Sequence, residues 1–321
     1  MTEATVRTPR LDRARTAAWL QDYGVYAAVV VLLLFNIVFT PNFLSGANFR
    51  TQLVQAAPVV IVALGMALVI GTEGVDLSVG SVMALSAALV PLYLGYGSGV
   101  AVLVSVVVGL AVGCLSGALV AYVGIQPIVA TLAILVGGRG LALVIAGGQL
   151  VTIHDPGFLA LGTGDVLGVP VTVVVAAVLA VAVWLVVGRT TFGRRLVAIG
   201  DNRAASTLAG LPVRRVLVGV YAVSGVLAAV AGVLATARLG AGDPANTGLL
   251  MELSAITAVV VGGTPLSGGK VRIVGTVMGA LLMQLLRATL IKNDIPDSTA
   301  QMIQAAIIVV AVYAARERGS R

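Results

Sequence analysis

Apolar runs close to the length of a membrane crossing recur from one end of the sequence to the other, and this feature limits the possible folds most. A helix needs about 20 consecutive apolar residues to cross the hydrocarbon core of a bilayer. Apolar residues make up 59% of the 321 residues and charged residues only 10%, which leaves too little polar surface for a water-soluble fold. The sequence therefore predicts an all-α integral membrane protein.

The runs predict about ten transmembrane helices in a single polytopic domain over residues 23–315, with tails at residues 1–22 and 316–321. The eighth span is short, so we expect a half-helix or a re-entrant element there. The expected spans are Tyr23–Thr40, Leu53–Ile70, Leu77–Leu94, Val100–Val123, Ile128–Ala146, Val169–Val187, Val216–Ala237, Met251–Val261, Val274–Leu290 and Ala300–Ala314.

Clusters of basic residues predict the orientation, because short cytoplasmic flanks are enriched in lysine and arginine. The loop 147–168 contains Asp155 and Asp165 and no basic residue. We therefore expect both termini and the loop 188–215 to face the cytoplasm, with Arg50, Arg287 and Lys292 as exceptions on the outer side. The basic flanks of the spans then account for the net charge of +7, and nucleic-acid binding is not needed to explain it. The clusters are Arg7, Arg10, Arg13 and Arg15, then Arg189, Arg194, Arg195, Arg203, Arg214 and Arg215, and finally Arg316, Arg318 and Arg321.

Enzymatic chemistry has little support in the sequence. Cys114 and His154 are the single residues of their types, so no internal disulfide can form and no metal-ligand spacing occurs. The segment ending at Lys270 is rich in glycine, but a phosphate-binding loop would need glycine at Thr264 and serine or threonine at Val271. We expect no cofactor in this chain and a compact turn between helices at this place.

Two carboxylates lie between the second and third apolar runs, in the segment Gly71–Gly80. A carboxylate at membrane depth is costly unless it faces a cavity or a partner, so Glu73 and Asp76 are functional candidates. The alternative is a tight turn in which Asp76, helped by Ser78, caps a helix that begins near Leu77. Both roles can hold at once.

The loop after the sixth span, Thr190–Gly210, has an order of features that exceeds a plain basic flank. A Gly-Asp-Asn break at 200–202 precedes a short helix-prone stretch, Arg203–Leu208, which Gly210 ends. A short helix across the inner face has a suitable shape for docking into a cleft of a partner.

Together, these motifs resemble the permease subunits of ribose/xylose-type (monosaccharide) ABC importers, a family within a wider group that includes branched-chain amino acid permeases. The resemblance runs from about residue 60 to residue 314, and Thr72, Glu73 and Pro265 depart from the pattern. It is carried by Gly74–Ser81 (GVDLSVGS), Gln126–Thr131 (QPIVAT), Arg139–Leu141 (RGL), Thr191–Arg194 (TFGR), Ala198–Asn202 (AIGDN) with Ala204 and Ala205, Glu252–Ile256 (ELSAI) and Gly262–Gly269 (GGTPLSGG).

The resemblance implies a permease of the bacterial plasma (inner) membrane that performs no chemistry itself. Its expected partners are cytoplasmic ATP-binding subunits, which carry ATP and magnesium, an extracytoplasmic solute-binding protein and a second permease copy. The residues implied in coupling to the ATPases are Phe192, Gly193, Arg194, Gly200, Asn202, Ala204, Ala205, Gly262, Gly263, Gly268 and Gly269. For a neutral sugar, which needs hydroxyl and amide partners, the candidate pathway residues are Asp76, Ser78, Gln126, Thr131 and Asn246.

Two alternatives stay open at this point. The same machine could carry a branched-chain amino acid, a nucleoside or an autoinducer-type molecule. A secondary transporter could instead use Glu73 or Asp76 with an ion gradient, which predicts uptake without ATP.

Overall fold

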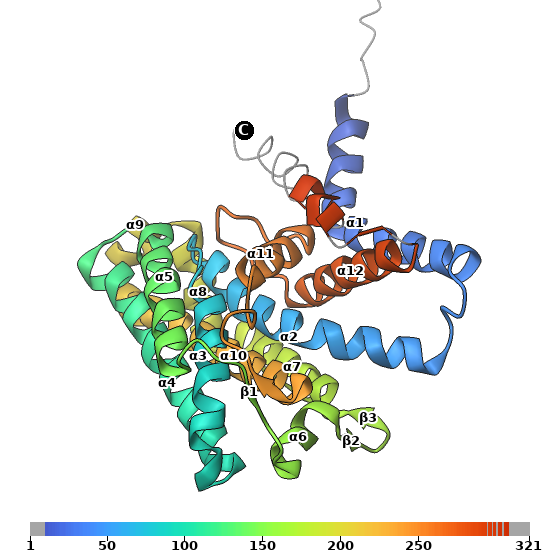
Figure 1. Cartoon of the computed structure of the whole chain (residues 1–321). Helices are drawn as coiled ribbons and strands as arrows, with labels where there is room; N and C mark the ends of the chain where they lie inside the picture. Colours follow the sequence, from blue (N-terminus) through green and yellow to red (C-terminus); the bar gives the residue numbers. More distant parts are fainter. Residues whose placement is uncertain (1–9, 294, 297, 300, 304, 308–321) are drawn as a thin grey trace, which may run out of the picture.

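The computed structural model describes residues 10–293, 295, 296, 298, 299, 301–303 and 305–307, with side chains described from residue 24 on. Most of these residues are helical (Figure 1). The expected tenth span, Ala300–Ala314, falls largely outside the described residues. The expected C-terminal tail does so completely, and so does the N-terminal tail apart from the helical backbone that begins at Arg10.

Seven of the described helices are long and apolar enough to cross a membrane, and two shorter apolar stretches accompany them, Gly24–Phe39 of α1 and the whole of α11. The helices are α1 (Arg10–Phe39), α2 (Gly46–Gly71), α3 (Val79–Tyr93), α4 (Ser98–Ala118), α5 (Pro127–Ile145), α6 (Pro156–Thr163), α7 (Val171–Arg189), α8 (Thr191–Asp201), α9 (Arg203–Leu208), α10 (Val213–Leu239), α11 (Met251–Val261) and α12 (Ile273–Lys292). A 3-10 turn, Leu94–Tyr96, extends α3, and a π-helical turn, Leu119–Val123, extends α4.

Most ends of the first nine expected spans differ from these helices by no more than three residues. The largest difference at a span start within the side-chain-described region is at α2, which begins seven residues before the expected Leu53. The reason is a local cap: the Ser45 hydroxyl accepts a hydrogen bond from the backbone N–H of Asn48, so the helix starts in a polar stretch that hydropathy alone misses.

The centre of the protein is formed by α2, α3 and α10, which are buried over most of their length, whereas α4, α5 and α7 lie on the perimeter. Small residues allow α4 to approach α10 closely. Gly109 packs against Gly225, and Gly113 packs against the backbone of Tyr221. A side chain at either glycine would collide with the α10 backbone, so these glycines serve packing.

Two non-helical stretches of the chain lie beside α3. Before it, residues 72–78 return from the end of α2 without forming a helix. Beside it, residues 241–250 run non-helically along α3, since Gly242 contacts Pro91 and Gly248 contacts Gly80. Eleven residues of α3 separate these contacts, a rise of about 16 Å. The eleven-residue helix α11 follows, with the bounds expected for the short eighth span.

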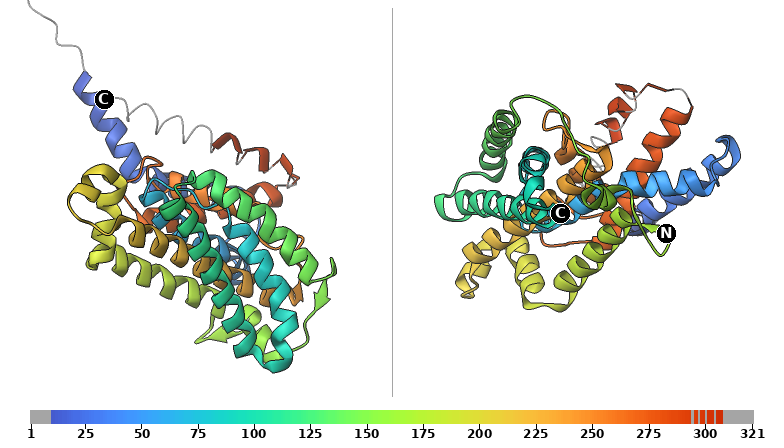
Figure 2. Two further views of the ribbon diagram at one scale, coloured as in Figure 1. Left: turned by 90° about the vertical axis from the view of Figure 1, so that its left-hand side faces the viewer. Right: turned by 60° about the horizontal axis from the view of Figure 1, so that its bottom comes forward.

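The short helices α9 and α6 lie at opposite ends of the molecule (Figures 1 and 2). The loop 147–168 is more ordered than we expected, because it contains α6, whose N-terminus is capped by Asp155. Strand β1 (Val151–Thr152) pairs with β4 (Ala241–Gly242), and β2 (Asp165–Val166) pairs with β3 (Val169–Pro170). Arg50, one of the basic residues expected on the outer side, forms an ion pair with Asp165 at 2.7 Å. It therefore has an acidic partner at the α6 end of the molecule.

Candidate functional site

The loop between α7 and α10 forms two short helices, α8 and α9. As predicted, α9 spans Arg203–Leu208; the Asn202 side chain accepts a hydrogen bond from the Ala205 N–H at its start, and Gly210 follows with a φ of 76°. The break is narrower than we expected, because Gly200 and Asp201 still belong to α8. The Thr190 hydroxyl caps α8, a signal that could have predicted this helix.

Among the described residues, the outer surface of this helix pair is not covered by the rest of the chain. Arg194, Asn202, Ala204 and Ala205 are exposed, and Leu208 is 90% exposed. At this exposure the leucine side chain buries almost no apolar surface within the fold. Exposed apolar side chains of this kind are typical of a contact surface. We call the exposed residues 194, 195, 201–205, 207 and 208 the docking surface.

The inner side of α8 packs through glycines against two other segments. Gly200 lies against the carbonyl oxygen of Gly71 at the end of α2, and against the backbone of Gly269. The Gly269 N–H donates to the Gly71 oxygen at 3.1 Å, and the neighbouring Gly268 lies close to the backbone of Glu73. A Cβ atom on Gly200 would overlap with the Gly71 oxygen, so this contact requires glycine. We call Gly71, Gly200, Gly268 and Gly269 the glycine junction.

The junction joins three motifs that lie far apart in the sequence: the GVDLSVGS region, the loop after the sixth span and the glycine-rich turn. The turn 262–272 is held at its base, where Thr264 accepts a hydrogen bond from the Arg272 N–H and Gly262 packs against Gly275 of α12. Gly263 has a φ of 87°. Gly193, also predicted for coupling, lets α8 approach Val187 of α7, and the half-buried Phe192 contacts Gly219.

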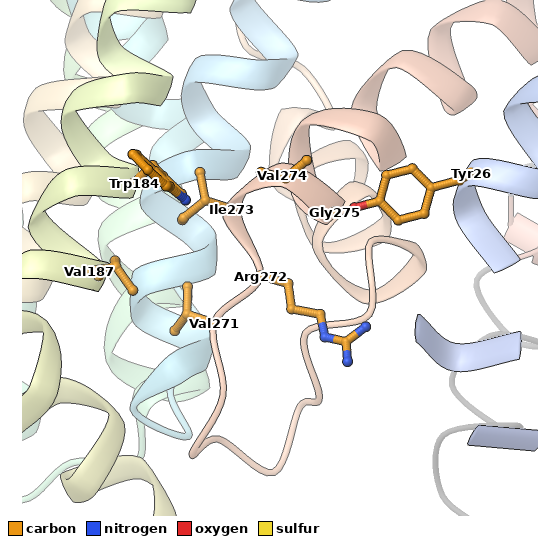
Figure 3. Close-up of a pocket in the computed structure, with 9 residues that line it drawn as sticks. Tyr26, Trp184, Val187, Val271, Arg272, Ile273, Val274 and Gly275 are labelled. Carbon is orange, nitrogen blue, oxygen red and sulfur yellow. The ribbon is translucent and has the colours of Figure 1, made fainter. Parts of the chain in front are cut away.

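A cavity of about 350 Å³ lies on the other side of the turn, between α1, α7 and the start of α12 (Figure 3). Trp184, Ile273 and Tyr26 line it on these three helices, and the Arg272 side chain extends along it from the turn. The turn is therefore packed against α8 on one side and borders this cavity on the other.

The two carboxylates of the GVDLSVGS region have different environments. Glu73 is exposed beside the glycine junction, with a φ of 64°, and its role as a functional candidate stays a prediction. Asp76 is fully buried and accepts hydrogen bonds from the N–H and hydroxyl of Ser78 and, at 2.7 Å, from the hydroxyl of Ser224 on α10. Asp76 thus closes a turn with Ser78, the N-cap position of α3, and ties this turn to α10; α3 has no side-chain cap and begins two residues later than the expected Leu77.

The remaining candidate pathway residues do not meet at one point. Thr131 is buried and donates to the carbonyl oxygens of Pro127 and Val75. Gln126 is exposed just before α5, at the α9 end of the molecule. Asn246 is exposed in the non-helical segment beside α3 and donates to Asp243 at 2.8 Å. Their role in transport stays a prediction.

A second polar group, which sequence reasoning did not single out as a site, surrounds Asn246. The Arg139 guanidinium of α5 donates to the carbonyl oxygen of Ala245 at 3.0 Å and lies within electrostatic range of Glu252 on α11. Glu252 is 8% exposed, and its Oε2 has no hydrogen-bond partner among the described residues. We call Arg139, Asp243, Asn246 and Glu252 the polar cluster. Arg139 and Glu252 lie in motifs that we used only for the resemblance; a charge inside an apolar run was the available signal.

Taken together, the fold and these sites define a class: a multi-pass helical membrane protein, with broken helices and charged side chains inside it and an exposed helix pair at one end. This is the organisation of a transport permease. No group of three or more metal-binding side chains occurs in the described part of the chain.

Comparison with known proteins agrees with this class. The chain belongs to the family described as "Branched-chain amino acid transport system / permease component", whose model matches residues 48–312. It is 37% identical to the ribose import permease protein RbsC of Escherichia coli strain K12 over 96% of this chain and 98% of the relative. It is 36% identical to the fructose import permease protein FruF of Bifidobacterium longum, over 90% and 86% of the two chains. Identity to the galactofuranose transporter permease protein YtfT of E. coli is 34%, over 95% and 92%. No solved structure matches the chain.

Proposed function

We propose that this chain is the membrane permease subunit of an ATP-binding-cassette importer that moves a monosaccharide or a related polyol into the cytoplasm. Relatives that import ribose and fructose, and one that transports galactofuranose, support this class of solute. The observation that carries the mechanism is the glycine junction, where the helix pair α8–α9 meets both the end of α2 and the turn before α12.

The expected partners follow from this assignment. Two ATPase subunits, which hold ATP and magnesium, bind the docking surface of a permease pair, and an extracytoplasmic solute-binding protein delivers the sugar. The pair is two copies of this chain or this chain with a paralogue. Closure of the ATPases moves α8 and α9, and the backbone contacts of Gly200 pass that motion to α2 and α12, because packed backbones transmit displacement with little give.

The proposed location is the bacterial plasma (inner) membrane, as one membrane domain over residues 23–315. The docking surface and both termini face the cytoplasm. The exposed Arg194 and Arg195 beside α9 support this orientation, as does the acidic pair Asp155 and Asp165 at the α6 end.

Gentle affinity purification from native membranes, followed by mass spectrometry, tests the proposal. An ATPase subunit should accompany the wild type and be lost from the variant Leu208→Glu, which changes an exposed side chain that the fold does not need. Leu167→Glu makes the same change at a fully exposed leucine between β2 and β3, at the α6 end, and is the matched control. Uptake by the chain alone, in ATP-free vesicles with an ion gradient, would favour a secondary transporter instead.

A second cargo deserves testing because the family description names branched-chain amino acids. Competition for uptake separates the two cargoes. Unlabelled leucine should leave the uptake of labelled sugar unchanged, whereas unlabelled ribose, fructose or galactose should reduce it if that sugar is the natural solute.

A further inference from the structure

Glu252 is a buried carboxylate that lacks a donor for one oxygen. Its residue is 8% exposed, and Oε2 has no hydrogen-bond partner among the described residues. This oxygen faces the first turn of α3, where an added Cβ on Gly80 would lie 2.5 Å from it and 2.6 Å from the carbonyl oxygen of Gly248. Two hydrogen-bond acceptors, Glu252 Oε2 and the Gly248 carbonyl oxygen, thus lie next to Gly80. A buried acceptor is normally paired with a donor. The oxygen is enclosed in this conformation, so a donor reaches it only when the non-helical segment 241–250 moves away from α3.

The polar cluster around Glu252 lies at membrane depth and has a side that the chain does not cover. Arg139 lies twelve residues into α5 and is half-exposed, and Asn246 is exposed. A guanidinium and an amide at this depth are tolerated where they meet water or a partner but not lipid. The non-helical backbone at residues 241–250 leads to the same conclusion, because irregular backbone within a membrane must be covered by protein or line a water-filled cavity.

The two charged groups are arranged to complement a neutral solute. The Arg139 guanidinium donates through Nη1 to the carbonyl oxygens of Ala245 and Pro244, and these bonds hold the non-helical segment in place. The guanidinium has further N–H donors. Glu252 offers an acceptor, and Asn246 an amide whose N–H₂ is bound to Asp243 and whose oxygen accepts. Hydroxyl groups, which both donate and accept, satisfy such a mixed set.

We propose that the polar cluster is the point at which the solute is held during passage: sugar hydroxyls donate to Glu252 Oε2 and accept from Arg139, and Asn246 contacts them from the non-helical segment. The inference rests on the proposed function and adds the substrate class that this site selects, a neutral polyhydroxylated molecule. The carboxylates of Asp243 and Glu252 repel an anionic solute such as a sugar phosphate.

Transport kinetics test the site in the complete importer, reconstituted with its ATPase and binding protein and supplied in parallel with labelled ribose, fructose and galactose. Glu252→Gln keeps the size of the side chain but removes the charge and replaces one acceptor with a donor. We expect a fall in sugar uptake of about tenfold with basal ATP hydrolysis unchanged, and partial recovery in Glu252→Asp. Asp165→Asn, which neutralises a partly exposed carboxylate at the α6 end, outside the polar cluster and the glycine junction, is the matched control. Wild-type uptake by Glu252→Gln for all three sugars would overturn the proposal.

Chemical labelling of introduced cysteines is a second test. It measures the access of water to the polar cluster and does not depend on transport. In a Cys114→Ser background, Asn246→Cys places a thiol in the proposed pathway, and Val178→Cys places one on the perimeter helix α7, where the side chain is 61% exposed. A water-soluble maleimide reacts with thiolates, so it should label position 246 and leave position 178 unlabelled. The transported sugar should slow labelling at 246. Equal resistance of both positions would mean that the polar cluster does not line an aqueous path.

The two proposals fail in different ways. Uptake that never requires ATP would overturn the importer assignment, whatever Glu252 does. ATP-dependent sugar uptake that is insensitive to Glu252→Gln, with position 246 unlabelled, would leave the importer standing and overturn the polar cluster as its solute site.

Discussion

The glycine junction and the polar cluster are built in opposite ways. At the junction, Gly200 meets two other segments through backbone atoms, and there is no room for a methyl group on Gly200. In the polar cluster, side chains provide the contacts, one carboxylate oxygen has no hydrogen-bond partner among the described residues, and Asn246 is exposed. Tight backbone packing transmits movement, whereas an incompletely satisfied polar site can accept a ligand. The difference therefore separates a coupling element from a recognition element within one membrane domain.

The largest effect should come from Gly200→Ala. The added methyl overlaps with the Gly71 oxygen and must push α8 away from α2, and overpacking of this kind costs about 1–3 kcal/mol. We expect ATP-dependent uptake to fall by at least about tenfold while ATPase subunits still co-purify. Gly188→Ala, on α7 where an added Cβ meets no neighbouring atom, should behave as the wild type. Normal uptake by Gly200→Ala would show that the junction does not transmit motion.

A smaller effect is expected from Gly80→Ala, which tests the other region. The methyl would press on Glu252 Oε2 and on the Gly248 carbonyl oxygen, so the acceptor moves out of place. Sugar uptake should fall about fivefold, and basal ATP hydrolysis should stay at the wild-type rate. Gly95→Ala, where an added Cβ has no close neighbour, is the control. A loss of ATP hydrolysis in Gly80→Ala would mean that the two regions are not separable in function.

The smallest effect should come from Asn202→Ala, which removes the cap of α9. Loss of an N-cap costs about 1 kcal/mol, so α9 should fray and bind the ATPase about fivefold more weakly, as measured by titration of the purified subunits. Ser45→Ala removes the corresponding cap of α2 at the far end of the molecule and should leave ATPase affinity unchanged. Equal weakening in both variants would point to general destabilisation and not to docking.

The helices that cross the membrane could be predicted from the sequence because their signal is local: an apolar run of sufficient length is itself the reason for the span. The same holds for α9, where Asn202 and Gly210 mark the start and the end. Helix α8 was missed because Gly193 and Gly200 favour a break, and only the close approach of Val187 and Gly71 explains why glycines stand in a helix there.

The candidate site could be predicted only in part. The three coupling motifs were recognisable one by one, but their meeting at Gly71, Gly200 and Gly269 depends on tertiary packing. Glu73 and Asp76 look equivalent in the sequence, yet a left-handed turn at Glu73 sends one carboxylate outward and the other inward. The pairing of Arg139 with the segment before Glu252 has no local signal, since it depends on how α5 lies against the non-helical chain.

The most direct test of this account is the number of sugar molecules moved for each ATP hydrolysed, measured in the reconstituted importer for the wild type, Gly200→Ala and Glu252→Gln. The account predicts that Gly200→Ala lowers this ratio by at least about fivefold, because ATP hydrolysis continues without moving the pathway, while Glu252→Gln keeps the ratio of the wild type at saturating sugar and raises KM. An unchanged ratio in Gly200→Ala, or an equal fall in both variants, would contradict the division between the coupling junction and the solute site.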